Sequence, residues 1–570
     1  MSARRRSAPP SAGRGELRLL FFLSLLIIGL LCVVVRLFSV QVVEAKRYQA
    51  LANDQRLRRV EIAPHRGIIY DRQGKELAFS VDAETIYATP YFIKNPALVA
   101  SKLSPILELD EASLFEKLTK DCGFAYIARK VDEEKAEAVR ALGIEGIGFL
   151  KEGKRYYPYD SLGSHVIGFV GMDGRGLAGL ELYYDEFLRG KPGQLVAEND
   201  PLGRPIPGGV SKLISSTDGN DVILTIDRDI QYKAEEELRL QVERFQAKGG
   251  NIIVMNPRAG EIYAMANEPT FDLNGFSETS AGSLRNRAVT DVYEPGSIMK
   301  AIIASAALEE RMYQLDDVLH LPSTIKVSDK VIGEAHPRPP EDFTFTEIVA
   351  RSSNVGIVTI GLELGKERMC RYIEAFGLTK RTGIDFPGET YGFTPPPDDW
   401  SGSTIGNIPF GQGISATPLQ MIQAFSVLAN DGFLVRPHLL CKVINAKGET
   451  VKTYPEDRGC KVISTQTARE MRGILEQAVN EGTGKAARID GYRVAGKTGT
   501  AQKPGEKGGG YEPGRYIASF IGFAPAQDPQ FVILVVIDEP VGTMYGGVVA
   551  APVFKKVAEF SLRHFRIPPE

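Results

Sequence analysis

The chain has 570 residues, of which 43% are hydrophobic and 24% are charged, and its formal net charge is −3. The composition is ordinary for a globular protein, and the length predicts two or three folded units. The slightly negative charge argues against a nucleic-acid partner, which favours a clearly basic surface.

Cysteine and histidine give no sign of a bridge framework or of a metal centre. The five cysteines are scattered without a CxxC pair, so we interpret them as reduced or buried single residues. The six histidines never fall at metal-ligand spacing, so the sequence predicts no metal site.

A long apolar segment lies near the N-terminus. Residues 19–35 carry no charge, and after Arg36 the apolar character continues to Val43. At 1.5 Å per residue this is enough to cross a hydrocarbon core of about 30 Å. A cleaved signal peptide would need a small-residue site just after the apolar core, but the nearest A-x-A is residues 50–52. We expect an uncleaved transmembrane anchor over residues 19–43.

The charges around this segment indicate its orientation. Five arginines precede the span and favour a cytoplasmic tail over residues 1–18. Basic residues also follow the span, so the asymmetry is modest, but long downstream domains are exported largely regardless of such charges. We expect a single-pass membrane protein, with most of the chain outside the cytoplasm.

Residues 44–215 have the pattern of a mixed α/β domain. Residues 130–142 form a charge-rich amphipathic pattern that predicts a helix. Residues 201–209 are rich in Pro and Gly, which suggests a connector. We therefore predict an N-terminal domain over residues 44–215 and a C-terminal domain over residues 216–570.

The C-terminal domain begins and ends with strands. Asp227 is predicted to cap a helix over residues 230–245, and residues 251–265 have the pattern of a hairpin. Helices are predicted between residues 295 and 378, late strands near 493–495, 517–524 and 531–537, and a last helix over 551–564. Strands at both ends with helices between them predict an α+β domain, with one sheet that unites distant segments.

The first chemical motif is Ser297-Ile-Met-Lys300, which follows a Pro-Gly turn and opens an apolar helix. Free backbone N–H groups at a helix start suit a reaction that develops an oxyanion. Lys300 lies on the same helical face, where a neutral amine can take the Ser297 proton. The motif alone is weak, because Ser323-Thr-Ile-Lys326 has the same form, and we interpret that second copy as chance.

The second motif is Ser352-Ser-Asn354, between two predicted apolar helices. Thr344 and Glu347 resemble a capping box for the first of these helices. Taken alone, the triplet is better explained by a loop that ends a helix.

The third motif is Lys497-Thr-Gly-Thr500, on a predicted strand. Small residues let a substrate backbone approach a strand edge, and a lysine with hydroxyl groups can meet a carboxylate. The order SxxK, SxN, KTG is much more specific than any one motif, and this combination is typical of penicillin-binding proteins and β-lactamases.

Nearly the whole chain resembles class B penicillin-binding proteins. Besides the three motifs, the resemblance rests on residues 65–72, 179–181, 255–261, 269–272 and 411–420. Residues 285–297, with Glu294-Pro-Gly before the serine, resemble the division-type subgroup. The resemblance implies an elongated pedestal domain of the dimerisation type over residues 44–215. It also implies a transpeptidase domain like the serine β-lactamases, an antiparallel sheet flanked by helices.

The resemblance also implies a mechanism without a cofactor. Ser297 is the nucleophile of a D,D-transpeptidase, Lys300 its general base, and Ser352 a proton relay to the leaving amine. Asn354 orients Lys300 and the substrate amide, and Lys497 sets the electrostatic field.

Substrate binding is assigned by the same resemblance to Thr498, Gly499 and Thr500. The two threonine hydroxyls hold the terminal carboxylate of the stem peptide, and the backbone N–H groups of Ser297 and Thr500 form the oxyanion hole. The implied partners are D-Ala-D-Ala donor peptides, acceptor amines, β-lactams, a membrane glycan polymerase and other division proteins.

Other functions stay open at this point. A β-lactamase or a carboxypeptidase uses the same motifs with water as acceptor, although the unit of about 170 residues before the transpeptidase domain argues against a simple β-lactamase. An elongation-type transpeptidase and a non-catalytic β-lactam sensor or scaffold also fit the three motifs.

Overall fold

The computed structural model describes residues 14–48, 57–62, 64–198, 211–455, 459–505 and 510–570. Most of the predicted cytoplasmic tail and the predicted connector at residues 201–209 lie outside these ranges. By compactness the chain forms two units, Met1–Pro64 with Lys191–Thr217, and His65–Gly190 with Asp218–Glu570. The predicted domain ranges themselves stay a prediction.

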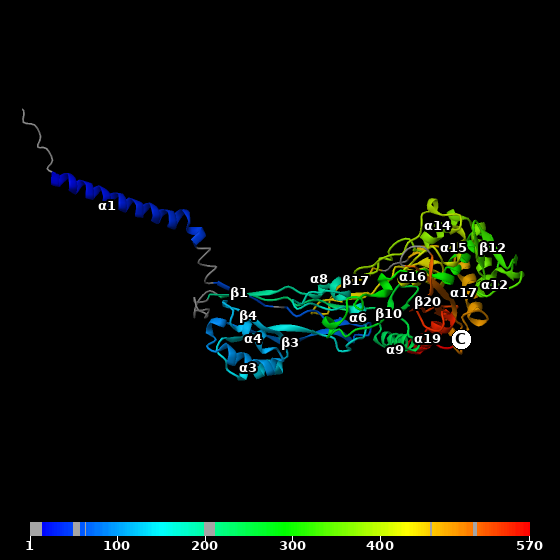
Figure 1. The fold of residues 1–570 in the computed structure, drawn as a ribbon, viewed down its shortest axis with the longest axis horizontal. Coiled ribbons are helices and arrows are strands. Elements are labelled where there is room, and N and C mark those ends of the chain that lie inside the picture. The colour runs from blue at the N-terminus through cyan, green and yellow to red at the C-terminus, as the bar shows by residue number, and fades with distance from the viewer. Residues whose placement is uncertain (1–13, 49–56, 63, 199–210, 456–458, 506–509) are drawn as a thin grey trace, which may run out of the picture. The chain divides into compact units, whose positions relative to one another are not determined.

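The first unit contains the apolar N-terminal helix. Helix α1, Arg14–Phe38 (Figure 1), continues as a single π-helical segment, η1, Ser39–Val43. The large apolar side chains of α1 are exposed. Among the described residues, Gly15–Val43 is the one helix long and apolar enough to cross a membrane. The unit also contains a small antiparallel sheet of three strands, β1 Leu57–Ile62, β6 Gly193–Glu198 and β7 Ser211–Ile214.

The second unit begins with a seven-stranded mixed sheet. Its long strand β3, Glu76–Ala88, pairs with β2, β4 and β5, and β2 pairs in parallel with β8. The other strands are β2 Ile69–Tyr70, β4 Ala125–Val131, β5 Ile147–Tyr156, β8 Asp221–Leu224, β16 Leu440–Ile444 and β17 Thr450–Thr453. Helices α3 Pro96–Leu107, α4 Glu111–Leu118 and α5 Glu133–Ala141 bury a separate apolar cluster against β3 and β4. The sheet thus joins the N-terminal segments to strands of the C-terminal half.

A buried ionic cluster joins four segments near the N-terminal end of the second unit. Glu181, in α7 Gly179–Tyr183, has no exposed surface, and its two carboxylate oxygens accept from Arg66 Nε and Arg155 Nε, each at 2.6 Å. Arg66 also pairs with Asp185 at 2.6 Å, in α8 Asp185–Leu188. The predicted family boxes at residues 65–72 and 179–181 therefore meet in space through their charged members.

The C-terminal part is built on a five-stranded antiparallel sheet in the order β10-β9-β21-β20-β19. Its strands are β9 Gly249–Met255, β10 Ile262–Glu268, β19 Ala495–Pro504, β20 Tyr511–Ala524 and β21 Phe531–Asp538. Segments from both ends of the domain therefore lie side by side, as the strand pattern predicted. The predicted α+β fold is confirmed.

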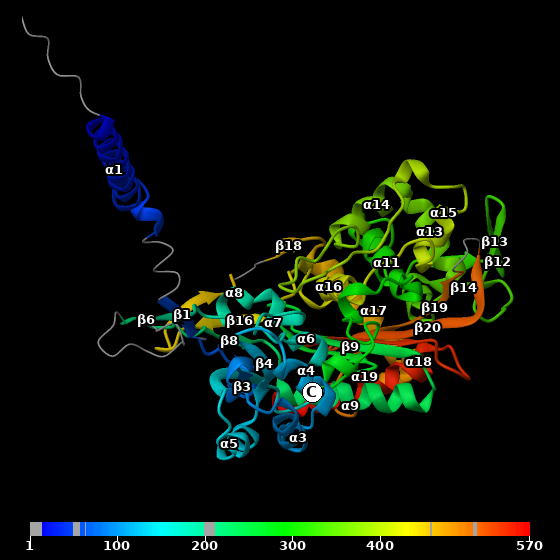
Figure 2. The same ribbon diagram turned by 60° about the vertical axis from the view of Figure 1, so that its left-hand side comes forward.

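Helices cover both faces of this sheet, because its residues point alternately to either side. Ile252 and Val535 pack in one buried cluster with α9 Arg228–Arg244 and α19 Ala551–His564. Ile253 and Leu534 pack in the other cluster, with α11 Met299–Glu309, α16 Pro418–Ala429 and α17 Thr465–Asn480. Figure 2 shows α9 and α19 on one side of the sheet and α11 and α16 on the other.

Several shorter elements complete the structure. The helical ones are α10 Arg287–Thr290, η4 Gly296–Ile298, α12 Phe345–Ala350, α13 Asn354–Leu364, α14 Lys366–Ala375, α15 Thr404–Asn407 and α18 Gly546–Val549. Three further antiparallel strand pairs are β11 Val318–Leu321 with β14 Glu341–Thr344, the hairpin of β12 Thr324–Val327 with β13 Lys330–Gly333, and β15 Phe433–Leu434 with β18 Cys460–Lys461.

The helix caps and the cysteines test the local predictions. Asp227 caps α9 through its side chain, and Thr344 with Glu347 forms a capping box on α12, as predicted. The five cysteines are unpaired, as predicted, but none is buried: Cys32, Cys441 and Cys460 are exposed. The prediction of reduced or buried single residues is therefore confirmed through its first alternative, since all five cysteines are unpaired.

Candidate active site

Ser297 lies where the chain enters its central helix. It is the middle residue of η4, which leads directly into α11, and its side chain is half-buried. Gly296 has φ +56°, and a Cβ there would lie 2.8 Å from the carbonyl oxygen of Thr500. Only glycine lets this segment lie so close to β19. The Pro-Gly turn thus brings the serine against the strand that carries the third motif.

Lys300 is completely buried one turn later in α11. Its amine donates to the backbone oxygen of Ser352 at 2.6 Å, to the Ser352 hydroxyl at 3.2 Å and to Asn354 Oδ1 at 2.6 Å. The first and second motifs, separated by about fifty residues, therefore meet at this amine.

The second motif forms the turn between α12 and α13. Ser352 has φ +63°, an uncommon left-handed conformation for a residue with a side chain. Ser353 caps α13 by accepting from the Gly356 N–H, and Asn354 is the first residue of that helix. The turn therefore directs the side chains of Ser352 and Asn354 towards the Lys300 amine, whereas the Ser353 side chain caps α13.

The third motif lies on β19, at the edge of the five-stranded sheet. Lys497 is completely buried, and its amine donates to the Ser352 hydroxyl at 2.9 Å. Thr498 Oγ1 lies 2.7 Å from Thr483 Oγ1, and Thr500 Oγ1 accepts from the Gly546 N–H at 3.3 Å. All three motifs therefore converge on one hydroxyl, that of Ser352.

Gly499 is packed too closely to carry a side chain. A Cβ at this position would lie 2.2 Å from Ser519 Oγ and 3.1 Å from Ile298 Cδ1. Glycine therefore lets β19 approach the segment that carries Ser297, which agrees with a strand edge built for close backbone contact.

The surroundings lower the pKa of both lysines. Burial holds the pKa of Lys300 well below the usual 10.5, the charge of Lys497 lowers it further, and the carboxylate of Glu334 opposes both effects. Burial lowers the pKa of Lys497 to about 7. A buried amine with a depressed pKa can be neutral near neutral pH, and a neutral amine can accept a proton.

The second SxxK sequence lies elsewhere. Ser323 and Lys326 are exposed, and Lys326 belongs to the β12–β13 hairpin. It contacts none of the three motifs through a hydrogen bond in the described part of the chain, which agrees with our interpretation of this copy as chance.

One residue at the site could not be predicted from the sequence. Glu334 follows β13, and its carboxylate accepts from the Asn354 N–H at 2.6 Å and from the Ser353 hydroxyl. No recognisable pattern surrounds this residue in the sequence, so only the fold reveals it.

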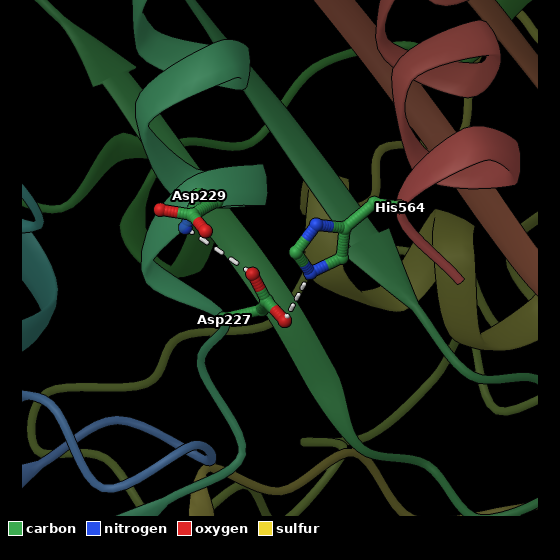
Figure 3. A group of neighbouring side chains, drawn as sticks. All are labelled: Asp227, Asp229 and His564. Atoms are coloured by element: carbon green, nitrogen blue, oxygen red, sulfur yellow. Dashed lines mark hydrogen bonds and ion pairs between the residues drawn. The ribbon is translucent and has the colours of Figure 1, made fainter. Parts of the chain in front are cut away.

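A cluster of metal-ligand side chains occurs away from this site. Figure 3 shows Asp227, Asp229 and His564, whose ligand-type atoms lie within 4.8 Å of one another. Asp227 Oδ1 accepts the N–H groups of Asp229 and Ile230, and its Oδ2 accepts from Gln73 and lies 2.9 Å from His564 Nε2. These bonds account for the cluster as a helix cap, so we assign no metal to it, and the prediction of no metal site stays a prediction.

Two family models match the chain. The penicillin binding protein transpeptidase domain matches residues 250–559, and the penicillin-binding protein dimerisation domain matches residues 61–224. Together they cover all three motifs and most of the second unit.

Curated relatives agree with these matches over almost their full length. The chain is 36% identical to the stage V sporulation protein D of Bacillus subtilis, over 97% of this chain and 86% of that protein. It is 31% identical to the peptidoglycan D,D-transpeptidase FtsI of Buchnera aphidicola, over 96% of this chain and 95% of that protein.

Solved structures share the fold. Penicillin binding protein 3 of Mycobacterium tuberculosis, complexed with aztreonam, matches with a TM-score of 0.71 and 29% identity, over 90% of this chain and 98% of that one. With two family models and relatives above 30% identity over nearly all of both chains, the chain belongs to the penicillin-binding protein transpeptidases with a dimerisation domain.

Proposed function

We propose that the chain is a peptidoglycan D,D-transpeptidase that cross-links stem peptides through an acyl-enzyme on Ser297. The observation that carries this proposal is the buried amine of Lys300, one helical turn after Ser297, joined to Ser352 and Asn354. Among the described residues no carboxylate contacts the Lys300 amine, and burial of an uncompensated charged amine destabilises the fold. A role as the base that activates Ser297 explains why a lysine stands at this buried position.

The first half-reaction acylates the enzyme. Neutral Lys300 takes the Ser297 proton, and Ser297 Oγ attacks the carbonyl carbon of the penultimate D-alanine. The bond to the terminal D-alanine then breaks, while the Ser352 hydroxyl relays a proton to the leaving amine. The hydrogen bonds from Lys300 and Lys497 to Ser352 support this relay, because they connect the leaving-group side to the base.

The second half-reaction regenerates the serine. An acceptor amine attacks the ester carbonyl and forms a new peptide bond, the bond between the acyl carbon and Ser297 Oγ breaks, and the proton of the amine returns to Ser297 Oγ through the same groups. The backbone N–H groups of Ser297 and Thr500 are proposed to stabilise the oxyanion in both halves.

The KTG strand is proposed to bind the donor peptide. The hydroxyls of Thr498 and Thr500 hold the terminal carboxylate, and Gly499 lets β19 lie close to Ser519 and Ile298, which places this strand edge beside Ser297. The pairing of these hydroxyls with Thr483 and with the Gly546 N–H fixes their positions before substrate arrives. β-Lactams acylate Ser297 in this scheme, because they mimic the D-Ala-D-Ala end.

The proposal also covers the location of the protein in the cell and its role there. Gly15–Val43 anchors the protein in the bacterial inner membrane, with the N-terminus in the cytoplasm and the catalytic part outside. The resemblance of residues 285–297 to the division-type subgroup supports a septal role, and the relative named FtsI agrees with it. A glycan polymerase of the membrane is the expected protein partner.

Covalent labelling tests the proposed chemistry. Fluorescent penicillin should label the wild type, Ser297→Ala should abolish the label, and Ser323→Ala, in the exposed second SxxK, should label normally. Release of D-alanine when an acceptor peptide is supplied would then distinguish a transferase from a sensor. Labelling that survives in Ser297→Ala would contradict the proposal.

A further inference from the structure

The residue that holds the second motif lies outside all three motifs. Glu334 is the first residue after β13, and its side chain is only 8% exposed. Its carboxylate accepts from the Asn354 N–H at 2.6 Å through one oxygen and from the Ser353 hydroxyl through the other. Arg338 pairs with the same carboxylate at 3.1 Å, so the buried charge is compensated.

The carboxylate also lies at a favourable helix end. Asn354 opens α13, an eleven-residue helix, and an anionic group that accepts the first N–H of a helix is stabilised by the helix dipole. Ser353 caps the same helix and also donates its hydroxyl to Glu334. The carboxylate therefore binds two consecutive residues of the turn, Ser353 and Asn354.

The neighbouring residue, Gly333, adds a third hydrogen bond to the turn. Its carbonyl oxygen accepts from Asn354 Nδ2 at 3.0 Å, while Asn354 Oδ1 accepts from the Lys300 amine at 2.6 Å. The side-chain amide of Asn354 is therefore fixed from both ends, and its oxygen is aimed at Lys300.

The turn needs such an anchor, because its first residue is strained. Ser352 adopts φ +63°, a conformation that costs free energy for a residue other than glycine and persists only when its surroundings enforce it. In that conformation both its backbone oxygen and its hydroxyl reach the Lys300 amine. The contacts of Glu334 begin with the very next residue, Ser353.

We propose that Glu334 is a positioning residue that holds the Ser352–Ser353–Asn354 turn so that Ser352 and Asn354 meet the amine of Lys300. The inference rests on the proposed function and deepens it, because in the described part of the chain the Glu334 carboxylate bonds to Ser353, Asn354 and Arg338, and so would act on catalysis through the SxN turn.

A second effect of the same carboxylate makes the inference measurable. The negative charge of Glu334 raises the pKa of Lys300, against burial and against the charge of Lys497. Arg338 is the other charged group that pairs with this carboxylate. Loss of the carboxylate charge should therefore lower the pKa of Lys300 and move the acid limb of the acylation-rate profile to lower pH. A residue that only supported the fold would not move this limb.

The experiment measures acylation of the full-length protein in detergent by fluorescent penicillin, across pH, for wild type, Glu334→Gln and Glu334→Ala. Glu341→Gln is the matched control, because Glu341 is a half-exposed carboxylate on the nearby strand β14. Glu334→Asp, which keeps the charge, tests for partial rescue. The final labelled fraction is measured together with the rate.

The expected result is a fall in the acylation rate of about tenfold to a hundredfold for Glu334→Gln, because misplacement of a catalytic group by about 1 Å has effects of this size. The final labelled fraction should match the wild type, the acid limb should shift downward, and Glu334→Asp should recover part of the rate. Glu341→Gln should behave as wild type.

Two results would overturn the inference. One is a wild-type rate and limb in Glu334→Gln. The other is a lower labelled fraction with an unchanged rate and limb, since this would make Glu334 a residue of the fold only. Failure of the proposed function looks different, because the wild type itself would then not be labelled through Ser297.

Discussion

Lys497 and Ser352 lie 145 residues apart in the sequence, and the Lys497 amine donates a hydrogen bond of 2.9 Å to the Ser352 hydroxyl. This bond ties the edge strand β19 to the turn between α12 and α13. Since Lys300 donates to the same hydroxyl, Ser352 is the point at which the three motifs become one site.

Removal of the Ser352 hydroxyl should abolish its hydrogen bonds with Lys300 and Lys497 but leave both lysines and Ser297 in the site. Ser352→Ala is expected to slow acylation by penicillin about 10²- to 10⁴-fold, the usual contribution of a positioned proton-transfer group. Ser305→Ala is the control, because Ser305 is also buried but bonds only to its own helix, at Ala301. Stopped-flow labelling measures both, and equal rates would exclude Ser352 from the relay.

The protonation of Lys300 can be tested by a change that keeps its charge. Arginine remains protonated in proteins, so Lys300→Arg should lose acylation nearly as fully as Lys300→Ala if Lys300 is the base. Substantial labelling of Lys300→Arg would mean that this position supplies charge rather than proton transfer.

The pH dependence of the wild type follows from the same residue. Because the pKa of Lys300 is lowered, its neutral fraction increases as the pH rises through a value well below 10.5. The acylation rate should therefore climb along a limb in that lower range and then level off. A limb near the value of an exposed lysine, measured with a β-lactam that is stable across the range, would contradict the burial argument.

The ionic cluster around Glu181 should dominate the stability of its region. Glu181→Ala leaves the buried guanidinium groups of Arg66 and Arg155 short of a partner, so we expect a loss of about 3–5 kcal/mol. Glu137→Ala, at an exposed pair with Arg140, should change stability by no more than about 0.5 kcal/mol. Urea unfolding of the two variants gives the comparison, and similar midpoints would show that the cluster contributes little.

Topology is tested by a reporter fused after Glu570 that is active only when exported. We expect activity for the full chain and loss of membrane association when residues 1–43 are deleted, because Gly15–Val43 is the apolar span. A reporter that is active only in the cytoplasm would place the site on the wrong side for a wall substrate.

Much of the fold could be predicted from local patterns. The caps at Asp227 and Thr344 and the last helix, Ala551–His564, have local causes in hydrogen bonding and amphipathic spacing, and all three are confirmed. The pairing of early and late strands could also be anticipated, because strands at both ends of the domain need a common sheet.

Other features depend on contacts between distant segments. The glycines and prolines of residues 503–515 predict a mobile loop, but strand pairing extends to Pro504 opposite Tyr511. Residues 506–509 lie outside the described ranges, so the mobility prediction stays open. The glycines and prolines alone could not show how far the pairing of β19 with β20 extends.

The site itself was predictable only in part. The motifs named Ser297, Lys300, Ser352, Asn354 and Lys497, but their spacing could not show that two lysines share one hydroxyl. Glu334 could not be named at all, because a carboxylate recruited from a hairpin leaves no pattern in the sequence.

The order of the five-stranded sheet has a consequence for how the enzyme is made. β9 pairs with β21, and β21 pairs with β20, so β9 has no neighbour on that side until residues 531–538 have been synthesised. Lys497 and Thr500 arrive on the same late segment. A growing chain therefore exposes the apolar strand β9 for most of its synthesis, which is a period of aggregation risk. It also means that a product that stops before β19 lacks Lys497 and Thr500, so penicillin binding should report only on chains synthesised beyond residues 495–504.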